Sequence, residues 1–404
     1  FMLSARRSYA DVLAKPAIAI ANKVENMKIG AGAYFHDFNL KLNHIFSERS
    51  RLYLSGYHGK DHGRVSDESY NIWNSTDGHK NATTQWITAF NIDWGNSIAS
   101  MRWNYMLTPK LFSNTTATFS HYFFDTGMNN VTNYLKTNKR SEESFLYHSA
   151  IRDLAAKVDF DYFPVVNHAV KFGLHYTNHY FTPGYTQVYQ SDYNNAAKID
   201  TSYGNYNINT NELQLYIEDD FEIGPRLKIN AGVNLTAFHT DNEMFFYPQP
   251  RVSARFKGGQ NWSVKASYSR MAQFVHLLYN SGINLPTDIW VPATKTYTPP
   301  VSDQLAMGTN INLKMGLSLS VEGFYKTMHN LIEYKEGASF MSGSTSWEDK
   351  VDKGKGWAYG TEFLLEKTTG NTTGWIGYTW SKSERQFPNI NFNQIFPAKY
   401  NRRH

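Results

Sequence analysis

Three segments decide the fold: Leu213-Gln-Leu-Tyr-Ile-Glu218, Leu227-Lys-Ile-Asn-Ala-Gly-Val-Asn-Leu-Thr236 and Arg251-Val-Ser-Ala-Arg-Phe256. Apolar and polar side chains alternate along each of them, and the turn Ile223-Gly-Pro-Arg226 joins the first to the second. A period of two predicts extended strands with one apolar and one polar face. The same alternation recurs along most of the chain, so it sets the fold class.

The composition is polar overall but rich in aromatic residues. Of 404 residues, 41% are hydrophobic and 16% aromatic, and the mean hydropathy is −0.52. No apolar run approaches the roughly 18 residues of a membrane-spanning helix. The strands of a membrane β-barrel are only half apolar, so a barrel stays possible. The aromatic content suggests that these residues serve a surface rather than a core.

Charge and cysteine content exclude several classes of protein. The net charge is +5 and no basic cluster follows one face, which argues against a nucleic-acid partner. The absence of cysteine excludes disulfides and thiolate metal sites. The chain starts at Phe1 with strand-like sequence, so we expect it to be a piece of a longer protein.

We expect about fifteen strands, many long enough to cross a membrane when tilted. Their predicted ranges are 1–7, 34–46, 50–59, 86–106, 110–126, 146–163, 168–186, 209–223, 227–240, 245–257, 262–275, 303–314, 317–334, 355–368 and 372–386.

The connections between these strands alternate between short turns and mostly long loops. The short ones are 46–50, 107–110, 164–167, 223–226, 258–261, 314–316 and 369–371, and the long ones are 8–33, 60–85, 127–145, 187–208, 276–302 and 335–354. The link at 240–244 is the exception, and the first long connection is expected to hold a helix. Short turns on one rim and long loops on the other indicate an outer-membrane barrel.

In such a barrel the polar face of each strand lines the lumen. The charged residues expected there are Asp153, Lys157, Asp159, Asp161, Glu218, Asp220, Arg251, Arg255, Lys265 and Glu322. Aromatic girdles at the lipid headgroups are expected from Trp94, Trp103, Tyr122, Tyr162, Tyr180, Trp262, Tyr325, Trp357, Tyr359, Tyr378 and Trp380. The alternative is that these aromatics form cross-strand pairs in a soluble sheet.

Several stretches resemble the TonB-dependent outer-membrane receptors. They are Leu215–Val233, Pro250–Phe256, Ser267–Leu278, Leu285–Pro292, Val321–Tyr334, Gly356–Leu365 and Tyr400–His404. The resemblance spans most of the chain and is closest to the subgroup with an N-terminal carboxypeptidase-like regulatory domain. It implies an all-β, antiparallel transmembrane β-barrel of 22 strands with a plugged lumen.

By this resemblance, residues 1–404 are a partial outer-membrane barrel, from about the third to the seventeenth strand. The plug domain, the TonB box and the C-terminal closing strands are not in the sequence. A barrel without its closing strands exposes two unpaired edges in lipid, so we expect additional chain to complete it.

Residue patterns predict no catalytic or metal site, no cofactor and no enzyme. His175 and His179 share a face but are about 13 Å apart along a strand at roughly 3.3 Å per residue, too far to share one metal. The loop 191–195 with Asp200 offers oxygen ligands without the spacing of a calcium loop. The substrate-binding candidates are Tyr279, Trp290 and Tyr297, in a proline-rich loop over the mouth that alternatively only packs against another loop.

The leading hypothesis is a receptor in the bacterial outer membrane that imports a specific scarce solute: a siderophore, a glycan, a peptide or a cofactor. Its expected partners are outer-membrane lipid, the TonB complex through the missing N-terminal segment, and a surface lipoprotein. The alternatives are a passive porin without a plug, a surface adhesin whose loops carry the function, and a soluble β-sandwich binding module. The sequence does not identify the substrate.

Overall fold

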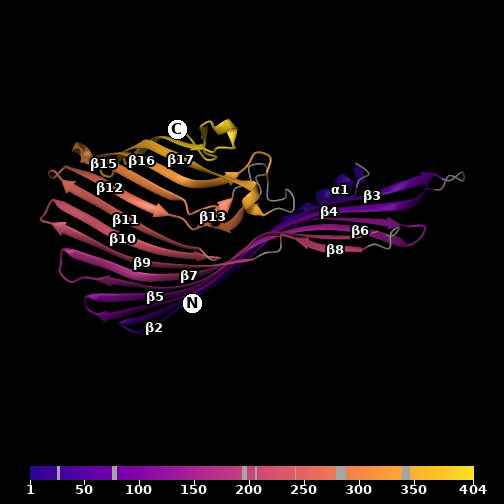
Figure 1. Ribbon diagram of the computed structural model, residues 1–404, viewed down its shortest axis with the longest axis horizontal. Helices are drawn as coiled ribbons and strands as arrows, with labels where there is room; N and C mark the ends of the chain where they lie inside the picture. The colour runs from indigo at the N-terminus through magenta and orange to yellow at the C-terminus, as the bar shows by residue number, and fades with distance from the viewer. Residues whose placement is uncertain are drawn as a thin grey trace.

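The computed structural model describes residues 1–24, 28–74, 80–192, 198–204, 207–241, 243–278, 288–338 and 346–404. In these ranges 17 strands form one antiparallel sheet, and β13 and β14 form a separate hairpin (Figure 1). The strands of the large sheet are β1 (Met2–Arg7), β2 (Ile29–Ser47), β3 (Ser50–Asn74), β4 (Lys80–Thr108), β5 (Leu111–Tyr134), β6 (Lys139–Tyr162), β7 (His168–Ser191), β8 (Lys198–Tyr203), β9 (Ile208–Ile223), β10 (Leu227–Thr240), β11 (Glu243–Lys257), β12 (Trp262–Ala272), β15 (Val301–Asn312), β16 (Leu317–Tyr334), β17 (Val351–Lys367), β18 (Gly374–Gln386) and β19 (Phe396–Pro397).

Almost every strand pairs with its neighbours in sequence, so the sheet is a meander. The short β8 (Lys198–Tyr203) pairs only with the far end of β7, and the rest of β7 pairs with β9. The hairpin β13 (Val275–Leu278) and β14 (Ile289–Pro292) interrupts the meander between β12 and β15, which pair directly. Helix α1 (Ala10–Val24) lies in the first long connection, as expected, and packs against β2.

One end of the sheet carries only short turns. Gly224, with φ of 63°, opens the turn between β9 and β10 in the left-handed conformation that glycine tolerates best. The opposite end departs from the expectation. Residues 60–74, 80–85, 127–134, 139–145 and 187–191 were expected in loops but continue the strands, so that β4 has 29 residues.

These continued strands form an extension that projects beyond the curved part of the sheet (Figure 1). A tilted strand needs only about 9 to 11 residues to cross a membrane, so much of β3 to β7 lies outside lipid. The loop prediction failed because most residues of the extension are polar on both faces, with few apolar ones such as Val65 and Val131. Its backbone hydrogen bonds to the neighbouring strands nevertheless keep it extended.

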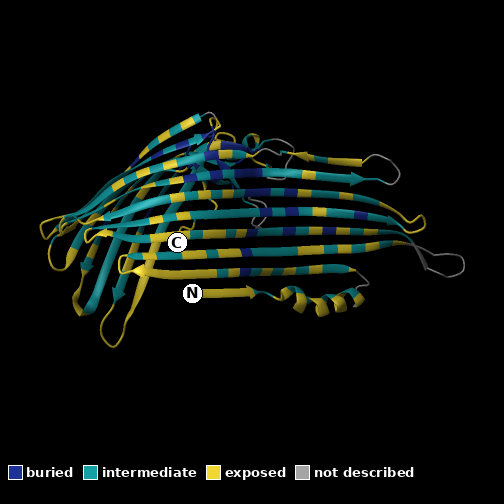
Figure 2. Cartoon of the chain, turned by 90° about the horizontal axis from the view of Figure 1, so that it is seen from below, coloured by how far each residue is buried: buried dark blue, intermediate teal, exposed yellow. Residues whose placement is uncertain are grey.

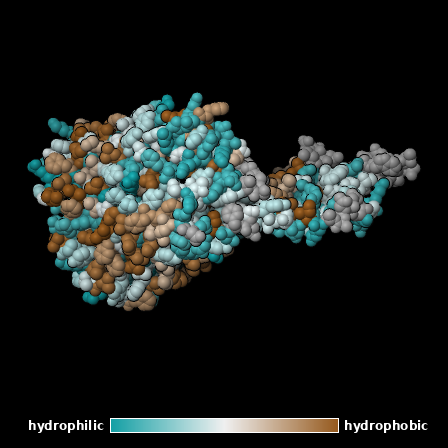
Figure 3. All heavy atoms as spheres, viewed as in Figure 1, coloured by the Kyte–Doolittle hydropathy of each residue, from teal (hydrophilic) through white to brown (hydrophobic). Residues whose placement is uncertain are grey.

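The strand register assigns each side chain to one of two faces. Leu174, Leu215 and Leu235 align across β7, β9 and β10, and His175 aligns with Gln214 on the opposite face. The apolar face is solvent-exposed in the isolated chain, with Leu305 60% and Met307 64% exposed. In Figure 3 hydrophobic residues cover much of the curved part, and the extension is mostly hydrophilic.

The other face lies inside the curved sheet. Hairpin strand β13 contacts β16, and β14 contacts β7 and β6, which lie six and seven strands away from β16 along the sheet. The sheet must therefore curl around the hairpin. All the charged residues predicted for the lumen are on this inner face by register, for example Asp161 opposite Lys171, and Lys171 opposite Glu218.

Most of the predicted aromatic girdle lies on the outer face. By register Trp103, Tyr162, Tyr180, Trp262, Tyr325, Trp357, Tyr359, Tyr378 and Trp380 share that face with the leucines. The prediction is wrong for Trp94 and Tyr122, which point inward and pack against the buried cluster under the hairpin. Their positions near strand ends suggested a girdle, but the strands extend further than expected.

A charge on the outer face should cost far more than a charge on the inner face. We expect Met307→Arg to destabilise the protein in lipid vesicles by roughly 2 to 4 kcal/mol, because an arginine side chain would face the hydrocarbon. Its neighbour Ala306 lies on the inner face, where Ala306→Arg should cost less than about 1 kcal/mol. Urea titration of the folded barrel in vesicles measures both, and equal losses would contradict the assignment of faces.

Candidate functional site

The candidate site is the mouth of the barrel, where the hairpin β13–β14 lies against the inner wall. Two buried clusters hold it there. The larger joins Leu278, Ile289 and Val291 of the hairpin to Phe124 and Tyr147 of the wall, and the smaller joins Phe274 and Ala293 to Phe238. Figure 2 shows the buried residues gathered midway along the strands. The hairpin therefore narrows the mouth from inside.

The two faces of the hairpin differ. His276 pairs with Val291 and Leu278 with Ile289, and all four side chains are buried. The alternate pair, Leu277 with Trp290, is on the opposite face and is only partly buried. Trp290 is therefore an aromatic side chain on the side of the hairpin that faces away from the wall.

His276 is buried in apolar surroundings. It is 3% exposed, and among the described residues its Nε2 has no hydrogen-bond partner. Burial lowers the pKa of His276 to about 4, because an imidazolium ion is poorly solvated there. The packed hairpin therefore holds a neutral histidine.

Tyr297 joins two loops. Its hydroxyl lies 2.9 Å from the carbonyl oxygens of both Glu348 and Val351 and shares its one proton between them, and its ring centre lies 5.7 Å from that of Trp347. The side chain is 8% exposed, and burial raises the pKa of its hydroxyl. Thr294, three residues earlier, donates a hydrogen bond to the Glu348 carboxylate. These contacts connect the end of the hairpin to the segment before β17.

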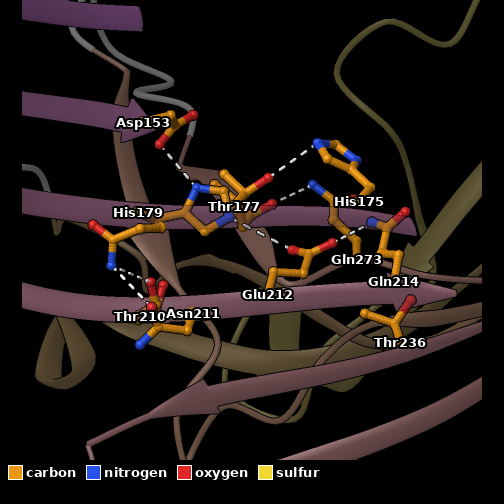
Figure 4. A network of polar contacts seen from close by, with 12 residues as sticks. Asp153, His175, Thr177, His179, Thr210, Asn211, Glu212, Gln214, Thr236 and Gln273 are labelled. Atoms are coloured by element: carbon orange, nitrogen blue, oxygen red, sulfur yellow. Dashed lines mark hydrogen bonds and ion pairs between the residues drawn. The ribbon is translucent and has the colours of Figure 1, made fainter. Parts of the chain in front are cut away.

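Beside the hairpin, a polar network covers the inner face of β6, β7 and β9 (Figure 4). His179 is 7% exposed and lies between two carboxylates. Its Nδ1 is 2.8 Å from Oδ1 of Asp153, and its Nε2 is 3.6 Å from Oε2 of Glu212. The second distance is short enough for an ion pair but too long for a hydrogen bond.

Neighbouring amide and hydroxyl groups extend this network. Gln214 donates to Glu212, and Gln249 donates to Thr236 over 2.8 Å. Thr210 is fully buried, and its hydroxyl has no hydrogen-bond partner among the described residues. The network offers hydrogen-bond donors, hydrogen-bond acceptors and ionisable groups, which suits a solute with several polar groups.

Deeper in the lumen, the inner wall carries ions in compensating pairs. Lys228 lies 3.0 Å from Asp220 and Arg251 lies 3.8 Å from Glu218, and Lys265 pairs with Glu322. Of these, Lys228, Asp220, Lys265 and Glu322 line a hollow of about 350 Å³ on β9 to β16. A dry core would not hold so many ions, so this part of the wall faces water.

The structure separates the three residues predicted to bind substrate. Trp290 is on the open face of the hairpin, and Tyr297 is in the packed junction of two loops. Tyr279 lies outside the described residues, as do residues 193–195 of the weak calcium candidate. In the described ranges, no three or more His, Cys, Asp or Glu side chains are arranged so that they could hold a metal ion.

The sequence pattern did not predict the cluster of Asp153, His179 and Glu212. Along the sequence, His179 is related only to His175 on the same strand. The partners stand on neighbouring strands, where Asp153 is directly opposite His179 and Glu212 is opposite Thr177. The signal that would have found them is the register of β6, β7 and β9.

Comparisons with known proteins agree with this architecture. The described residues contain no helix that is long and apolar enough to cross a membrane. An all-β sheet with an apolar outer face, a charged inner wall and short turns at one rim defines an outer-membrane barrel. The chain matches the TonB dependent receptor-like, beta-barrel family over residues 32–401 and belongs to that family. This family consists of outer-membrane transporters, not enzymes.

Solved structures share the fold at low sequence identity. The ferric-catecholate import receptor Fiu from K12 E. coli matches with a TM-score of 0.50 and 12% identity, over 89% of this chain and 64% of that one. The ferripyoverdine receptor of Pseudomonas aeruginosa matches with a TM-score of 0.51 and 10% identity, over 92% of this chain and 56% of that one. The copper transporter OprC matches with a TM-score of 0.50 and 10% identity, over 89% of this chain and 65% of that one.

The chain thus spans less than two thirds of the length of these receptors. No curated protein matches it.

Acidification should release the hairpin. The pKa of His276 is about 4 in the packed state and about 6.5 when the side chain is free, so the open state binds a proton first as the pH falls. Stability of the packed hairpin is complete above pH 6.5 and decreases by up to about 1.4 kcal/mol per pH unit down to pH 4.

Hydrogen exchange of residues 275–278 and 288–292 at pH 7 and pH 5, corrected for intrinsic rates, measures this effect. We expect weaker protection at pH 5 in the wild type and a smaller change in His276→Phe, which has no titrating group there. Equal pH dependence in the two proteins would contradict the assignment.

Proposed function

We propose that this chain is the transport barrel of a receptor that imports a specific scarce solute under the control of TonB. The observation that carries the proposal is the polar and charged inner wall whose mouth is narrowed by the inserted hairpin, in a chain of this family. A mouth narrowed from inside favours selective capture over free diffusion. Iron chelates and copper are the first substrate classes to test, because structures of similar fold are named for them.

Solute capture is proposed at the inner mouth. Trp290 offers a partly exposed ring, and Asp153, His179 and Glu212 offer hydrogen bonds and charge on the wall. We assign Tyr297 to positioning the hairpin, because its hydroxyl is occupied by two backbone carbonyl groups. Tyr279 is retained as a proposed contact from the sequence alone.

The remaining partners are also proposals. The large sheet has β1 at one edge and β18 with β19 at the other in the described residues, so we propose that further strands close the barrel and that a plug fills it. We propose that TonB acts on an N-terminal segment of the complete receptor and that the protein belongs to the subgroup with an N-terminal carboxypeptidase-like regulatory domain. The polar extension of β3 to β7 beside the mouth is the proposed dock for a surface lipoprotein.

Ion conductance separates an importer from a passive porin. We expect the complete receptor in planar bilayers to show no steady open-channel current, because a plug and the hairpin obstruct the lumen. In cells, uptake of labelled ferric catecholate, ferric pyoverdine or copper should require both this receptor and TonB. Steady conductance with solute flux that persists without TonB would establish the porin alternative instead.

Replacement of Trp290 should weaken capture without unfolding the barrel. We expect Trp290→Ala to lower the affinity for the imported solute roughly tenfold, a typical loss for an aromatic contact at a binding site. Trp262→Ala is the matched control, because Trp262 is on the outer face at the turn end of β12. Titration of the purified receptor with the solute measures both, and an unchanged affinity in Trp290→Ala would contradict the placement.

A further inference from the structure

The outer face of β2 to β7 carries an apolar groove. Its floor includes the small residues Gly56, Ala99, Ala117 and Ala156, which lie in two adjacent cross-strand rows. Its sides are formed by Leu42, Leu54, Met101, Phe119, Leu154 and Tyr176. The groove has a volume of about 670 Å³, within the range of ligand sites. It is continuous with the surface that faces lipid.

The next row toward the extracellular side changes abruptly from apolar to basic and polar. Across β3, β4, β5, β6 and β7, His58 is opposite Ser97, Ser97 opposite His121, His121 opposite Arg152, and Arg152 opposite Tyr180. Two residues along a strand span roughly 7 Å, so this row stands about one row spacing above the groove. We call it the basic row.

The basic row lies at the outer boundary of the membrane. On β4, the outer-face residues Trp103 and Tyr105 mark the turn end of the apolar band, and Ser97 marks its other end. The eight residue steps from Tyr105 to Ser97 span roughly 27 Å along the strand. With a tilt of about 40° this is roughly 20 Å of membrane thickness, close to the apolar band of such barrels.

The charged residues just beyond the basic row are paired with one another, whereas Arg152 within the row has no acidic partner among the described residues. One row further out, Lys60 pairs with Asp93 at 2.8 Å, and His148 pairs with Asp125 at 2.5 Å in the row beyond. Arg152 is exposed and lies 4.8 Å from the centre of the Tyr180 ring, and it has no carboxylate partner among the described residues. Ser97 accepts or donates a hydrogen bond with His58 Nδ1 at 2.9 Å. An uncompensated guanidinium at this level favours an anion supplied by the surroundings.

We propose that the groove and the basic row together bind a phosphorylated lipid of the outer leaflet. Its acyl chains occupy the groove between Leu42 and Tyr176, and its phosphate group contacts Arg152 with His121 and His58 beside it. This site is on the outside of the barrel and is independent of the solute site, so it stands or falls separately from the transport proposal.

Charge complementarity selects this occupant. A protein partner covering the groove would need to bury Arg152 opposite a carboxylate at the headgroup level. A free phosphate ion would use the basic row but leave the apolar groove unexplained. A phosphorylated lipid satisfies both halves of the site with one molecule, because its acyl chains begin directly below its phosphate.

The test uses the complete receptor, purified in detergent, and the probe lipid hexa-acylated diphosphoryl lipid A, with its dephosphorylated form for comparison. Native mass spectrometry counts bound lipid, and titration with a fluorescent analogue gives the affinity. We expect Arg152→Gln to weaken binding of the diphosphoryl form about tenfold and to leave the dephosphorylated form unchanged. Arg152→Lys should retain most of the affinity. Ala117→Phe, which fills the groove, should weaken both forms.

Arg270→Gln is the matched control. Arg270 is also on the outer face, but its guanidinium lies 3.4 Å from Asp303, so it has no free charge to offer a lipid. Heat-modifiable migration on gels checks that each variant is folded. The proposal is overturned if Arg152→Gln binds the diphosphoryl lipid as tightly as the wild type does, or if Arg270→Gln loses as much affinity as Arg152→Gln. It is also overturned if Ala117→Phe leaves the affinity unchanged, or if millimolar inorganic phosphate displaces the lipid.

Discussion

The structure depends on one constraint: in hydrocarbon every backbone N–H and C=O group must find a partner within the protein. The antiparallel ladder from β1 to β18 meets it strand by strand. Once the backbone is paired, side chains have only two faces to occupy. Leu215 and Leu235 lie on the face that meets lipid, and Gln214 and Asn234 lie on the face that meets the lumen.

The inner face changes character along the barrel axis, and this change creates the mouth. On β7 it begins with Lys171, continues through His175 and His179, and ends at the fully buried Phe181. The charged part requires water, and the apolar part requires a cover. The hairpin β13–β14 supplies that cover, which leaves the polar network around His179 at the junction between a wet lumen and a packed lid.

The alternation of apolar and polar residues predicted the strands that meet lipid. The polar extension and the partners of His179 depend on the pairing of strands in three dimensions, which the sequence pattern does not contain. The strands β9, β10 and β16 agree with their predicted ranges within a residue or so, since their alternation is strong. The extension was missed because Asn, Ser and Thr on both faces resemble a loop. His179 could not be matched to Asp153 without the register of β6 and β7. Trp290 and Tyr297 look alike in sequence, and only packing separates the partly buried ring of Trp290 from the buried ring of Tyr297.

The most direct test of this account is the accessibility of single spin labels from Leu213 to Ile217 in the receptor reconstituted in lipid. Oxygen partitions into the bilayer, and a nickel chelate stays in water, so the two relaxers report opposite faces. We predict that labels at Leu213, Leu215 and Ile217 respond to oxygen and that labels at Gln214 and Tyr216 do not. A profile without a period of two, or one with the phases exchanged, would contradict the assignment of lipid and lumen on which the proposed transporter depends.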